Sequence, residues 1–374
     1  MKLRLSDIAD VTMGQSPKSE FYNSDGQGMP FLQGNRTFGK KYPVFDTYTT
    51  MPTKTAKAGD IIMSVRAPVG DLNFTPVDIC LGRGVCGIRM KNGNQDFLFY
   101  LLKYYMPQLL NKESGTVFGS VNRSDINGLE LEIPDDEKEQ RKISRVLTML
   151  DEKIEENDAI NENLLEQLHM LYSTLFCDSA MDTPLGDVIA TTSGGTPSRK
   201  HDEYYSDSSI CWVKSKELLG NYIHETEEHI NYLAIKKSSA KLLPEHSVLI
   251  AMYGATVGAY GIVSKPMTCN QAVCALISNE DYPYTYLFQI AYESQQKFIN
   301  LAVGSAQQNI SQVLIKQLNI HSNLNVIRRF HDIALPIHKK IESLQAENMR
   351  LVALRDTLLP KLMSGEIDVS AIDL

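Results

Sequence analysis

Residues 143–175 read ISRVLTMLDEKIEENDAINENLLEQLHMLYSTL, and the spacing of their apolar side chains decides the fold. Positions three and four residues apart form one unbroken seam, which is typical of a helix that pairs with another helix in a coiled coil. A helix that only covered its own domain would show a wider, less regular stripe. At about 1.5 Å per residue the seam is roughly 48 Å long. Its ten positions are Ile143, Leu147, Leu150, Ile154, Asn157, Asn161, Leu164, Leu168, Leu171 and Leu175.

A second seam follows the first at a constant offset of 187 residues. Two equal seams in one chain most simply pair with each other, and a pseudo-twofold between the halves makes the pairing antiparallel. Asn161 and Asn348 are equivalent positions; each either fixes the register of the pair or is a polar residue tolerated near the surface. Arg355 should reach out to solvent, and Pro336 should kink or delay the second helix. The second seam is Phe330, Ala334, Ile337, Ile341, Leu344, Asn348, Leu351, Arg355, Leu358 and Leu362.

The helices belong to an internal duplication that covers the whole chain. Landmarks of the first half recur in the same order in the second, at offsets of 180 to 189 residues. Leu5, Gly14, Pro17, Val69, Gly70, Cys86 and Gly115 recur as Leu185, Gly194, Pro197, Val257, Gly258, Cys274 and Gly304. Each match alone is weak, but their common order indicates two copies of one domain.

Each copy mixes strands and helices. GDIIMSV and HSVLIAMY are typical of buried strands, and the aromatic residues of DFLFYLLKYYMPQLL and YTYLFQIAYESQQKFI recur at helical spacing. Core packing is favoured over base stacking for these aromatic residues. The predicted fold class is α+β, with two mixed α/β domains joined by two long helices that form an antiparallel coiled coil. We predict an N-terminal domain over 1–133, a long helix within 134–180, a C-terminal domain over 181–322, and the second helix with a tail over 323–374.

The formal net charge of −8 is concentrated in one segment. Residues 134–180 carry 5 basic and 12 acidic side chains, a net of −7, so the rest of the chain is nearly neutral. Any basic surface that faces DNA must therefore be a small patch within a nearly neutral domain. We expect the chain without a partner to bind DNA weakly and in a salt-sensitive way. The sequence has neither a membrane-spanning apolar run nor a signal-peptide core, so a cytoplasmic location is expected.

Catalytic motifs are missing or unconvincing. Gly82–Gly87 fits GxGxxG, but strand-like residues follow it where a dinucleotide site needs a helix. His224 and His229 in HETEEH are too far around a helix to share a face, so this segment is interpreted as a solvated acidic loop rather than a metal site. The sequence contains no Walker A string, no GxSxG, and no Asn/Asp-Pro-Pro-Tyr tetrad of a DNA-adenine methyltransferase. We therefore expect no catalysis, no metal and no cofactor in this chain.

LIAMYGATVG (Leu249–Gly258), GSAQQNIS (Gly304–Ser311) and LLPKLMSGEI (Leu358–Ile367) resemble the specificity subunit of type I restriction–modification systems. The resemblance extends over essentially the whole chain. It implies two target-recognition domains that each read half of a split DNA site, with helices that set the spacing and dock two methyltransferase subunits. Restriction subunits can join, and S-adenosylmethionine, ATP and Mg²⁺ are expected on these partners. The family's Glu-Gln box is present as Glu139-Gln140 but is replaced by Val326-Ile327 in the second copy.

The candidate DNA contacts lie on loops, several of them directly after buried strands. Arginine can bind guanine through two hydrogen bonds or contact a phosphate, and amide side chains can read adenine. If Lys214 and Lys216 contact DNA, they should contact phosphate, while Trp212 should belong to the core. A solvated surface role stays open for the set: Gln15, Arg66, Arg83, Thr116, Ser120, Asn122, Thr196, Lys214, Lys216, Tyr253, Ser305, Gln307, Gln308 and Asn309. The alternative function is a coiled-coil scaffold that binds only protein; it explains the acidity but not two differing globular copies.

Overall fold

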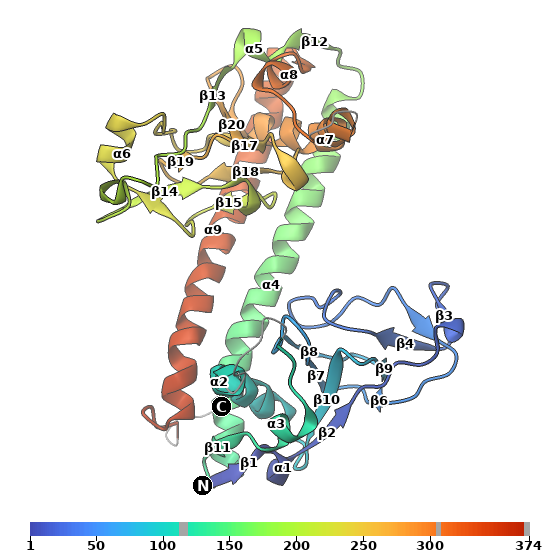
Figure 1. The fold of residues 1–374 in the computed structure, drawn as a ribbon. Helices are drawn as coiled ribbons and strands as arrows, with labels where there is room; N and C mark the ends of the chain where they lie inside the picture. The colour runs from blue at the N-terminus through green and yellow to red at the C-terminus, as the bar shows by residue number, and fades with distance from the viewer. Residues whose placement is uncertain (112–118, 304–307, 370–374) are drawn as a thin grey trace. The chain divides into compact units, whose positions relative to one another are not determined.

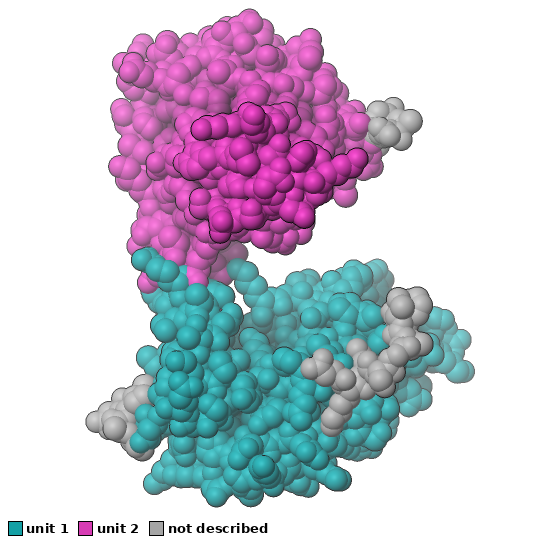
Figure 2. Space-filling view, turned by 60° about the vertical axis from the view of Figure 1, so that its left-hand side comes forward, with its two compact units in different colours: residues 1–154, 350–374 teal, residues 155–349 magenta. Residues whose placement is uncertain are grey.

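The structure, a computed structural model, describes residues 1–111, 119–303 and 308–369. The chain forms two compact units, which Figure 2 distinguishes by colour: unit 1 is Met1–Ile154 with Arg350–Leu374, and unit 2 is Glu155–Met349. Two 40-residue helices, α4 (Glu137–Phe176) and α9 (Leu324–Met363), each supply residues to both units. Within the described ranges, no helix has the length and hydropathy needed to cross a membrane.

Unit 1 is built on a four-stranded sheet in the order β2 (Ala9–Met13), β10 (Val85–Met90), β7 (Ile61–Ser64) and β8 (Leu72–Phe74). All four residues of β7 are buried, as the apolar run in GDIIMSV predicts. The aromatic helix α2 (Gln95–Asn111) packs on this sheet (Figure 1). Its Phe97, Phe99 and Tyr100 are at most 5% exposed. The interpretation as core is confirmed for these three aromatic residues, whereas Tyr104 and Tyr105 of the same helix are half-buried.

Smaller elements complete unit 1. A second sheet has the order β3 (Tyr22–Asn23), β5 (Tyr48–Thr49), β4 (Met29–Leu32), β9 (Ile79–Leu81) and β6 (Thr55–Ala56). The strand β1 (Lys2–Arg4) pairs with β11 (Glu130–Glu132), next to the short helices α1 (Leu5–Ile8) and α3 (Arg123–Asn127).

Unit 2 repeats this plan. Its main sheet has the order β13 (Ala190–Ser193), β20 (Val273–Ile277), β17 (Val248–Ala251), β18 (Tyr260–Val263) and β15 (Tyr222–Ile223), with α7 (Tyr284–Val303) packed on it. The second sheet is β16 (His229–Ile230), β14 (Ile210–Val213) and β19 (Thr268–Cys269). The remaining elements are the pair β12 (Met181–Pro184) and β21 (Asn319–His321), and the helices α5 (Leu185–Val188), α6 (Tyr232–Lys237) and α8 (Gln312–Lys316).

The strand register confirms the duplication residue by residue. In unit 1, Cys86 on β10 lies opposite Met13 on one side and Met63 on the other. In unit 2, Cys274 on β20 lies opposite Ser193 and Ile250. Both thiols are fully buried, so these cysteines serve as small core residues.

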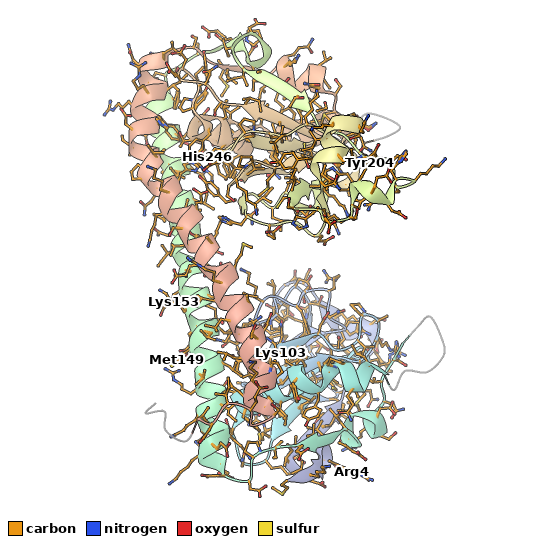
Figure 3. All side chains as sticks on the ribbon, turned by 90° about the vertical axis from the view of Figure 1, so that its left-hand side faces the viewer. Arg4, Lys103, Met149, Lys153, Tyr204 and His246 are labelled. Atoms are coloured by element: carbon orange, nitrogen blue, oxygen red, sulfur yellow. The ribbon has the colours of Figure 1, made fainter. Side chains whose placement is uncertain are left out.

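The long helices pack together and run antiparallel. In unit 2, Tyr172 contacts the edge of Phe330 with 5.9 Å between ring centroids, while Asn157 Nδ2 donates to Asn348 Oδ1 at 2.9 Å. Residues later in α4 therefore lie beside residues earlier in α9. All twenty predicted seam positions are buried or half-buried. Other apolar residues of α4 are exposed, among them Met149, which Figure 3 labels.

Pro336 does not delay the second helix. α9 begins at Leu324 and continues through Pro336. Ile327, Phe330 and Ala334, in the turns before the proline, are fully buried in the core of unit 2. Their burial outweighs the hydrogen bond that a proline removes from a helix.

The position of the Glu-Gln box lies partly inside the protein. Gln140 is only 3% exposed, and its Nε2 donates to the carbonyl oxygen of Pro134 at 2.9 Å. The equivalent residue of the second copy, Ile327, is fully buried in the core of unit 2. The exchange of glutamine for isoleucine is therefore a difference in internal packing.

Candidate nucleic-acid interface

Two loops of unit 2 that the sequence singled out separately lie against each other. Tyr253 follows β17 and forms an isolated antiparallel bridge with Asn309. The backbone N–H of Gly254 donates to the carbonyl oxygen of Gln308 at 2.8 Å, and that of Ile310 donates to Met252 at 2.9 Å. The exposed residues Tyr253, Gln308 and Asn309 line an open depression with Gly254. A phenol and two amides are thus gathered where they can form hydrogen bonds to a ligand.

Unit 1 contains the same bridge with different side chains. Arg66 follows β7 and pairs with Ser120, and the N–H of Val121 donates to the carbonyl oxygen of Val65 at 3.1 Å. Arg66 and Ser120 are both exposed. The backbone therefore presents an arginine and a serine in one unit where it presents a tyrosine and an asparagine in the other.

The glycines of these loops adopt a backbone conformation that other residues rarely adopt. Gly70 and the equivalent Gly258 have φ angles of +96° and +81°. A Cβ on Gly70 would lie 2.6 Å from Met106 Sδ of α2, and one on Gly258 would lie 2.9 Å from the carbonyl oxygen of Gln295 of α7. The recurrence of Val-Gly in the sequence thus reflects a tight turn against the aromatic helix.

A third loop joins this surface in unit 1. The N–H of Val65 donates to the carbonyl oxygen of Gly84 at 2.9 Å, so Arg66 and Arg83 lie on adjacent segments. The N–H of Arg83 in turn donates to Ser16 Oγ at 3.2 Å, next to Gln15. Gln15, Arg66 and Arg83 are exposed. The structure therefore brings together four candidates from distant parts of the sequence: Gln15, Arg66, Arg83 and Ser120.

The corresponding loop of unit 2 contains a residue that sequence reasoning missed. Gln271 is exposed and accepts a hydrogen bond from the hydroxyl of Thr196, a predicted candidate. Cys274 is offset by 188 residues from Cys86, and the same offset relates Gln271 to Arg83. Applying the offset of the repeat to every candidate would have found this glutamine.

The two candidate lysines are engaged in ion pairs. Lys214 binds Glu228, which also binds Arg199, and Lys216 Nζ donates to Glu227 Oε2 at 2.6 Å. The hydrogen bond from Lys214, together with that from Arg199, lowers the pKa of Glu228. The hydrogen bond with Glu227 raises the pKa of Lys216. Each lysine would have to exchange or share its carboxylate to bind a phosphate, whereas Trp212, 3% exposed, belongs to the core as expected.

Asn122 has a structural role that the sequence analysis did not assign. Its side-chain oxygen accepts hydrogen bonds from the N–H groups of Ser124 at 2.8 Å and Asp125 at 3.2 Å, so it caps the N-terminus of α3. Ser311 caps α8 of unit 2 in the same way. Three further candidates, Thr116, Ser305 and Gln307, lie outside the described residues.

Asn348 pairs with Asn157 rather than with Asn161, the position equivalent to it in the repeat. Besides the bond from Asn157, Asn348 Nδ2 donates to Asp158 Oδ1 at 3.0 Å. Asn161 is 5% exposed, and neither amide atom has a hydrogen-bond partner in the described part of the chain. The register role therefore has a geometric basis at Asn348, while Asn161 is a buried, unsatisfied polar group.

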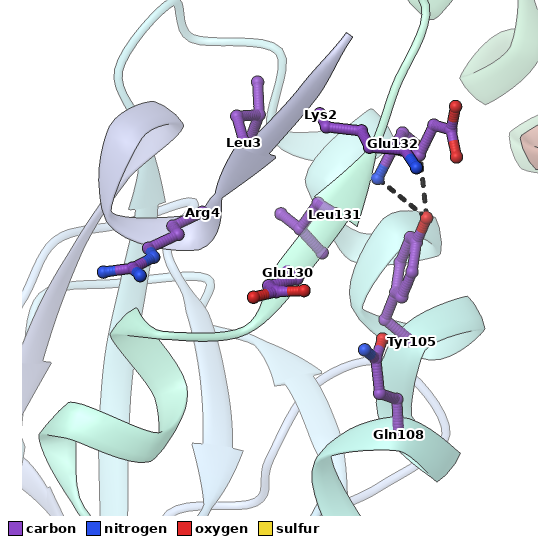
Figure 4. Close-up of a pocket in the computed structure, with 8 residues that line it drawn as sticks. All are labelled: Lys2, Leu3, Arg4, Tyr105, Gln108, Glu130, Leu131 and Glu132. Carbon is purple, nitrogen blue, oxygen red and sulfur yellow. Dashed lines mark hydrogen bonds between the residues drawn. The ribbon is translucent and has the colours of Figure 1, made fainter.

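Two other places were candidates for chemistry. The GxGxxG segment leads into the strand β10, so it lacks the helix that a dinucleotide site requires. Figure 4 shows a pocket of unit 1 lined by β1, β11 and α2, in which Tyr105 Oη donates to the carbonyl oxygen of Glu132 at 3.2 Å and accepts from its N–H at 2.8 Å. The phenol is thus engaged in joining α2 to β11.

Comparison with known proteins gives a consistent result. A model of the type I restriction modification DNA specificity domain matches residues 1–166 and again residues 180–322. The MjaIX specificity subunit of a type I restriction enzyme of Methanocaldococcus jannaschii is 25% identical over 405 residues, covering 98% of this chain and 93% of that one. A candidate specificity subunit from the same organism, MjaX, is 42% identical over 147 residues; this match covers 39% of this chain and only 34% of the relative.

A solved structure shows the same fold. The crystal structure of the type I restriction–modification S subunit from M. genitalium has a TM-score of 0.63 and 17% sequence identity, and covers 97% of this chain and 95% of that chain. At this identity the likeness concerns the fold: two mixed domains and two long helices.

Proposed function

The chain belongs to the family of type I restriction–modification DNA specificity subunits, and we propose that its two units read the two different halves of a split DNA target. Family membership accounts for two repeated domains in one chain. It does not support the alternative of a scaffold without DNA recognition.

The observation that carries the proposal is the bridge that recurs in both units with different side chains. Arg66 and Ser120 occupy in unit 1 the places that Tyr253 and Asn309 occupy in unit 2. An arginine suits the O6 and N7 acceptors of guanine, whereas an amide suits the N6 and N7 edge of adenine. The same backbone thus presents different hydrogen-bonding groups, which is what two unlike half-sites require.

The long helices supply the proposed docking surface for two methyltransferase subunits. α4 carries exposed apolar side chains away from its seam: Met149, Ile160 and Met170 are 44%, 41% and 70% exposed. Singly exposed apolar side chains are ordinary on a protein surface, so the docking proposal rests on membership of the family rather than on these three residues. Restriction subunits would join the same complex.

Catalysis would belong to those partners. We assign S-adenosylmethionine to the methyltransferase subunits, and ATP and Mg²⁺ to the restriction subunits. The purified chain alone should neither methylate nor cut DNA. A cytoplasmic location, where DNA and S-adenosylmethionine are available, fits this role.

An exchange of recognition domains tests the proposal. Residues 1–133 are replaced by those of another family member, and the methylated sites of cells that express the hybrid with its methyltransferase are sequenced. One half of the methylated motif should change while the other half stays the same. A simultaneous change in both halves would show that the units do not read DNA separately.

A further inference from the structure

Three potential metal ligands meet on the second sheet of unit 2. Cys211 on β14 lies directly opposite His229 on β16, and Glu225 comes from the loop that leads into β16. Cys211 Sγ lies 3.0 Å from Glu225 Oε1 and 3.7 Å from His229 Nε2, and the latter two atoms are 2.5 Å apart. In the part of the chain that the structure describes, this is the one group of three or more such residues close enough to hold an ion.

We propose that Cys211, Glu225 and His229 form a zinc site. Thiolate, imidazole and carboxylate are the three ligand types that zinc takes in proteins, at about 2.0–2.3 Å in tetrahedral geometry. Tetrahedral bonds of that length place the ligand atoms about 3.3–3.8 Å apart. The separations of the sulfur from the other two atoms are already close to this range. Only Glu225 Oε1 must move away from His229, by about an ångström.

The positions of the ligands favour a site that holds the sheet together. Cys211 is 1% exposed, so its thiolate would be held in place by the core, whereas Glu225 and His229 are accessible from solvent. The ion would join β14, β16 and the loop between β15 and β16. The same loop carries Glu227 and Glu228, the partners of Lys216 and Lys214. A zinc ion here would therefore fix the segment that holds the two candidate phosphate-binding lysines.

The site is not part of the plan that the two units share. The parallel pairing of β4 with β9 and of β14 with β19 places Pro30 where unit 2 has Cys211. Elsewhere in unit 2, a histidine and a glutamate form a surface pair without a cysteine beside them. His201 Nδ1 lies 2.9 Å from Glu203 Oε1, and neither side chain is buried. The cysteine is thus the residue that distinguishes the cluster from an ion pair.

The neighbouring lysine Lys265 opposes the binding of a cation. Its Nζ lies 3.3 Å from Glu225 Oε2, the oxygen that does not face Cys211. The lysine side chain is 48% exposed and can move into solvent when an ion binds. Zinc would thus replace Lys265 as the neighbour that neutralises Glu225.

Cobalt titration of the full chain, stripped with a chelator, tests the site. Co²⁺ should bind once per chain and give the visible bands of tetrahedral coordination with a thiolate-to-metal transition, and Zn²⁺ should displace it. Cys211→Ser should abolish the thiolate transition, and His229→Gln should weaken binding at least tenfold. Cys177→Ser, at an exposed thiol, and His201→Gln, at the surface pair, serve as controls and should bind as the unaltered chain does. Lys265→Gln should strengthen binding several-fold because it removes a neighbouring positive charge.

Circular dichroism of each metal-free variant shows whether it is folded. Glu225→Gln, at a partly exposed position, keeps the test decisive if Cys211→Ser fails to fold. The absence of stoichiometric cobalt binding to the unaltered chain would overturn the proposal. So would a thiolate transition that persists in Cys211→Ser, or binding to Glu225→Gln that equals that of the unaltered chain.

Discussion

Arg355 of α9 forms an ion pair with Asp151 of α4 within unit 1, with 2.6 Å between Nη1 and Oδ1. The two side chains are only 19% and 21% exposed, and Tyr100 Oη donates to the second carboxylate oxygen at 2.6 Å. The expectation that Arg355 reaches out to solvent is therefore wrong. An arginine in the seam can remain there because the facing helix supplies a carboxylate.

Removing this arginine should destabilise unit 1. In Arg355→Ala the Asp151 carboxylate loses its partner in a half-buried place, and we expect a loss of about 1–3 kcal/mol in the free energy of unfolding. Chemical denaturation of Arg355→Ala, Asp151→Asn and the double variant measures the coupling. Arg350→Ala, at an exposed position of the same helix, is the control and should change stability by less than about 0.5 kcal/mol. Additive effects of the two single substitutions would show that the pair contributes nothing.

The two seam asparagines of α4, Asn157 and Asn161, should respond in opposite directions to replacement by leucine. Asn161→Leu removes a buried amide without a hydrogen-bond partner and should raise the free energy of unfolding by about 1–2 kcal/mol. Asn157→Leu removes the hydrogen bonds to Asn348 and Glu347 and should lower it by a similar amount. Denaturation curves of the two variants test this. Equal effects would mean that the hydrogen bonds of Asn157 do not matter to the pair.

His338 should make unit 2 sensitive to mild acid. It is 1% exposed, its Nδ1 lies 3.0 Å from Tyr222 Oη, and burial lowers its pKa to about 3. The unfolded chain takes up a proton at this histidine below about pH 6.5, whereas the folded chain does not. Its contribution to stability is thus complete above pH 6.5 and is lost as the pH falls towards 3, by at most about 1.4 kcal/mol per unit.

The unfolding free energy of His338→Gln, compared with that of the unaltered chain from pH 7 to pH 4.5, isolates this contribution. The variant should lose less stability over this range. Identical slopes for the two proteins would assign the acid sensitivity to other groups.

Substitutions in the two bridges should damage different halves of the DNA target. Gln308→Ala with Asn309→Ala removes amides from unit 2, and losing a paired amide–adenine contact costs about 1–3 kcal/mol. Methylation at limiting complex should then fall by roughly 5- to 150-fold on the original motif, with relaxed sequence preference in one half. Arg66→Ala in unit 1 is the matched comparison and should relax the other half. An unchanged sequence preference in both variants would show that these side chains are solvated surface groups that do not read DNA.

Lengthening the helix pair should act on the spacer of the DNA motif. Seven residues are inserted between Ile154 and Glu155 and seven between Met349 and Arg350, which keeps both seams in phase. The added length is about 10.5 Å, or roughly three base pairs at 3.4 Å each. Three base pairs also turn the DNA by about 100°, so we expect a longer spacer or a large loss of methylation. The methylated sites are identified by sequencing. Full activity on the original spacer would show that the helices do not set the spacer length.

The sequence was most informative where structure depends on local pattern. Both seams and the buried strands were predictable because each follows from residues close together in the chain. The repeat also indicated the bridging loops, since one copy supported the interpretation of the other.

Contacts between distant segments were not predictable. The repeat relates Asn161 to Asn348, but in an antiparallel pair equivalent residues face each other only at the pseudo-twofold axis. Which residues do, here Asn157 and Asn348, depends on the axial stagger of the helices. Similarly, Cys211 gave no signal next to HETEEH, because the sheet pairing that brings it to His229 joins segments that the sequence shows only as separate strands.

The C-terminal end of α9 belongs to the core of unit 1, where Leu362, Met363 and Val369 are at most 5% exposed. Unit 2 is encoded by one continuous stretch, whereas unit 1 needs residues from both sides of it. On a ribosome that adds about 5–20 residues per second, the first 154 residues would wait roughly 10–40 seconds before the last part of their own core is made. The core of the N-terminal domain therefore becomes complete only after the C-terminal domain has been synthesised, and a chain cut short near its end would lack part of the core of the domain that was synthesised first.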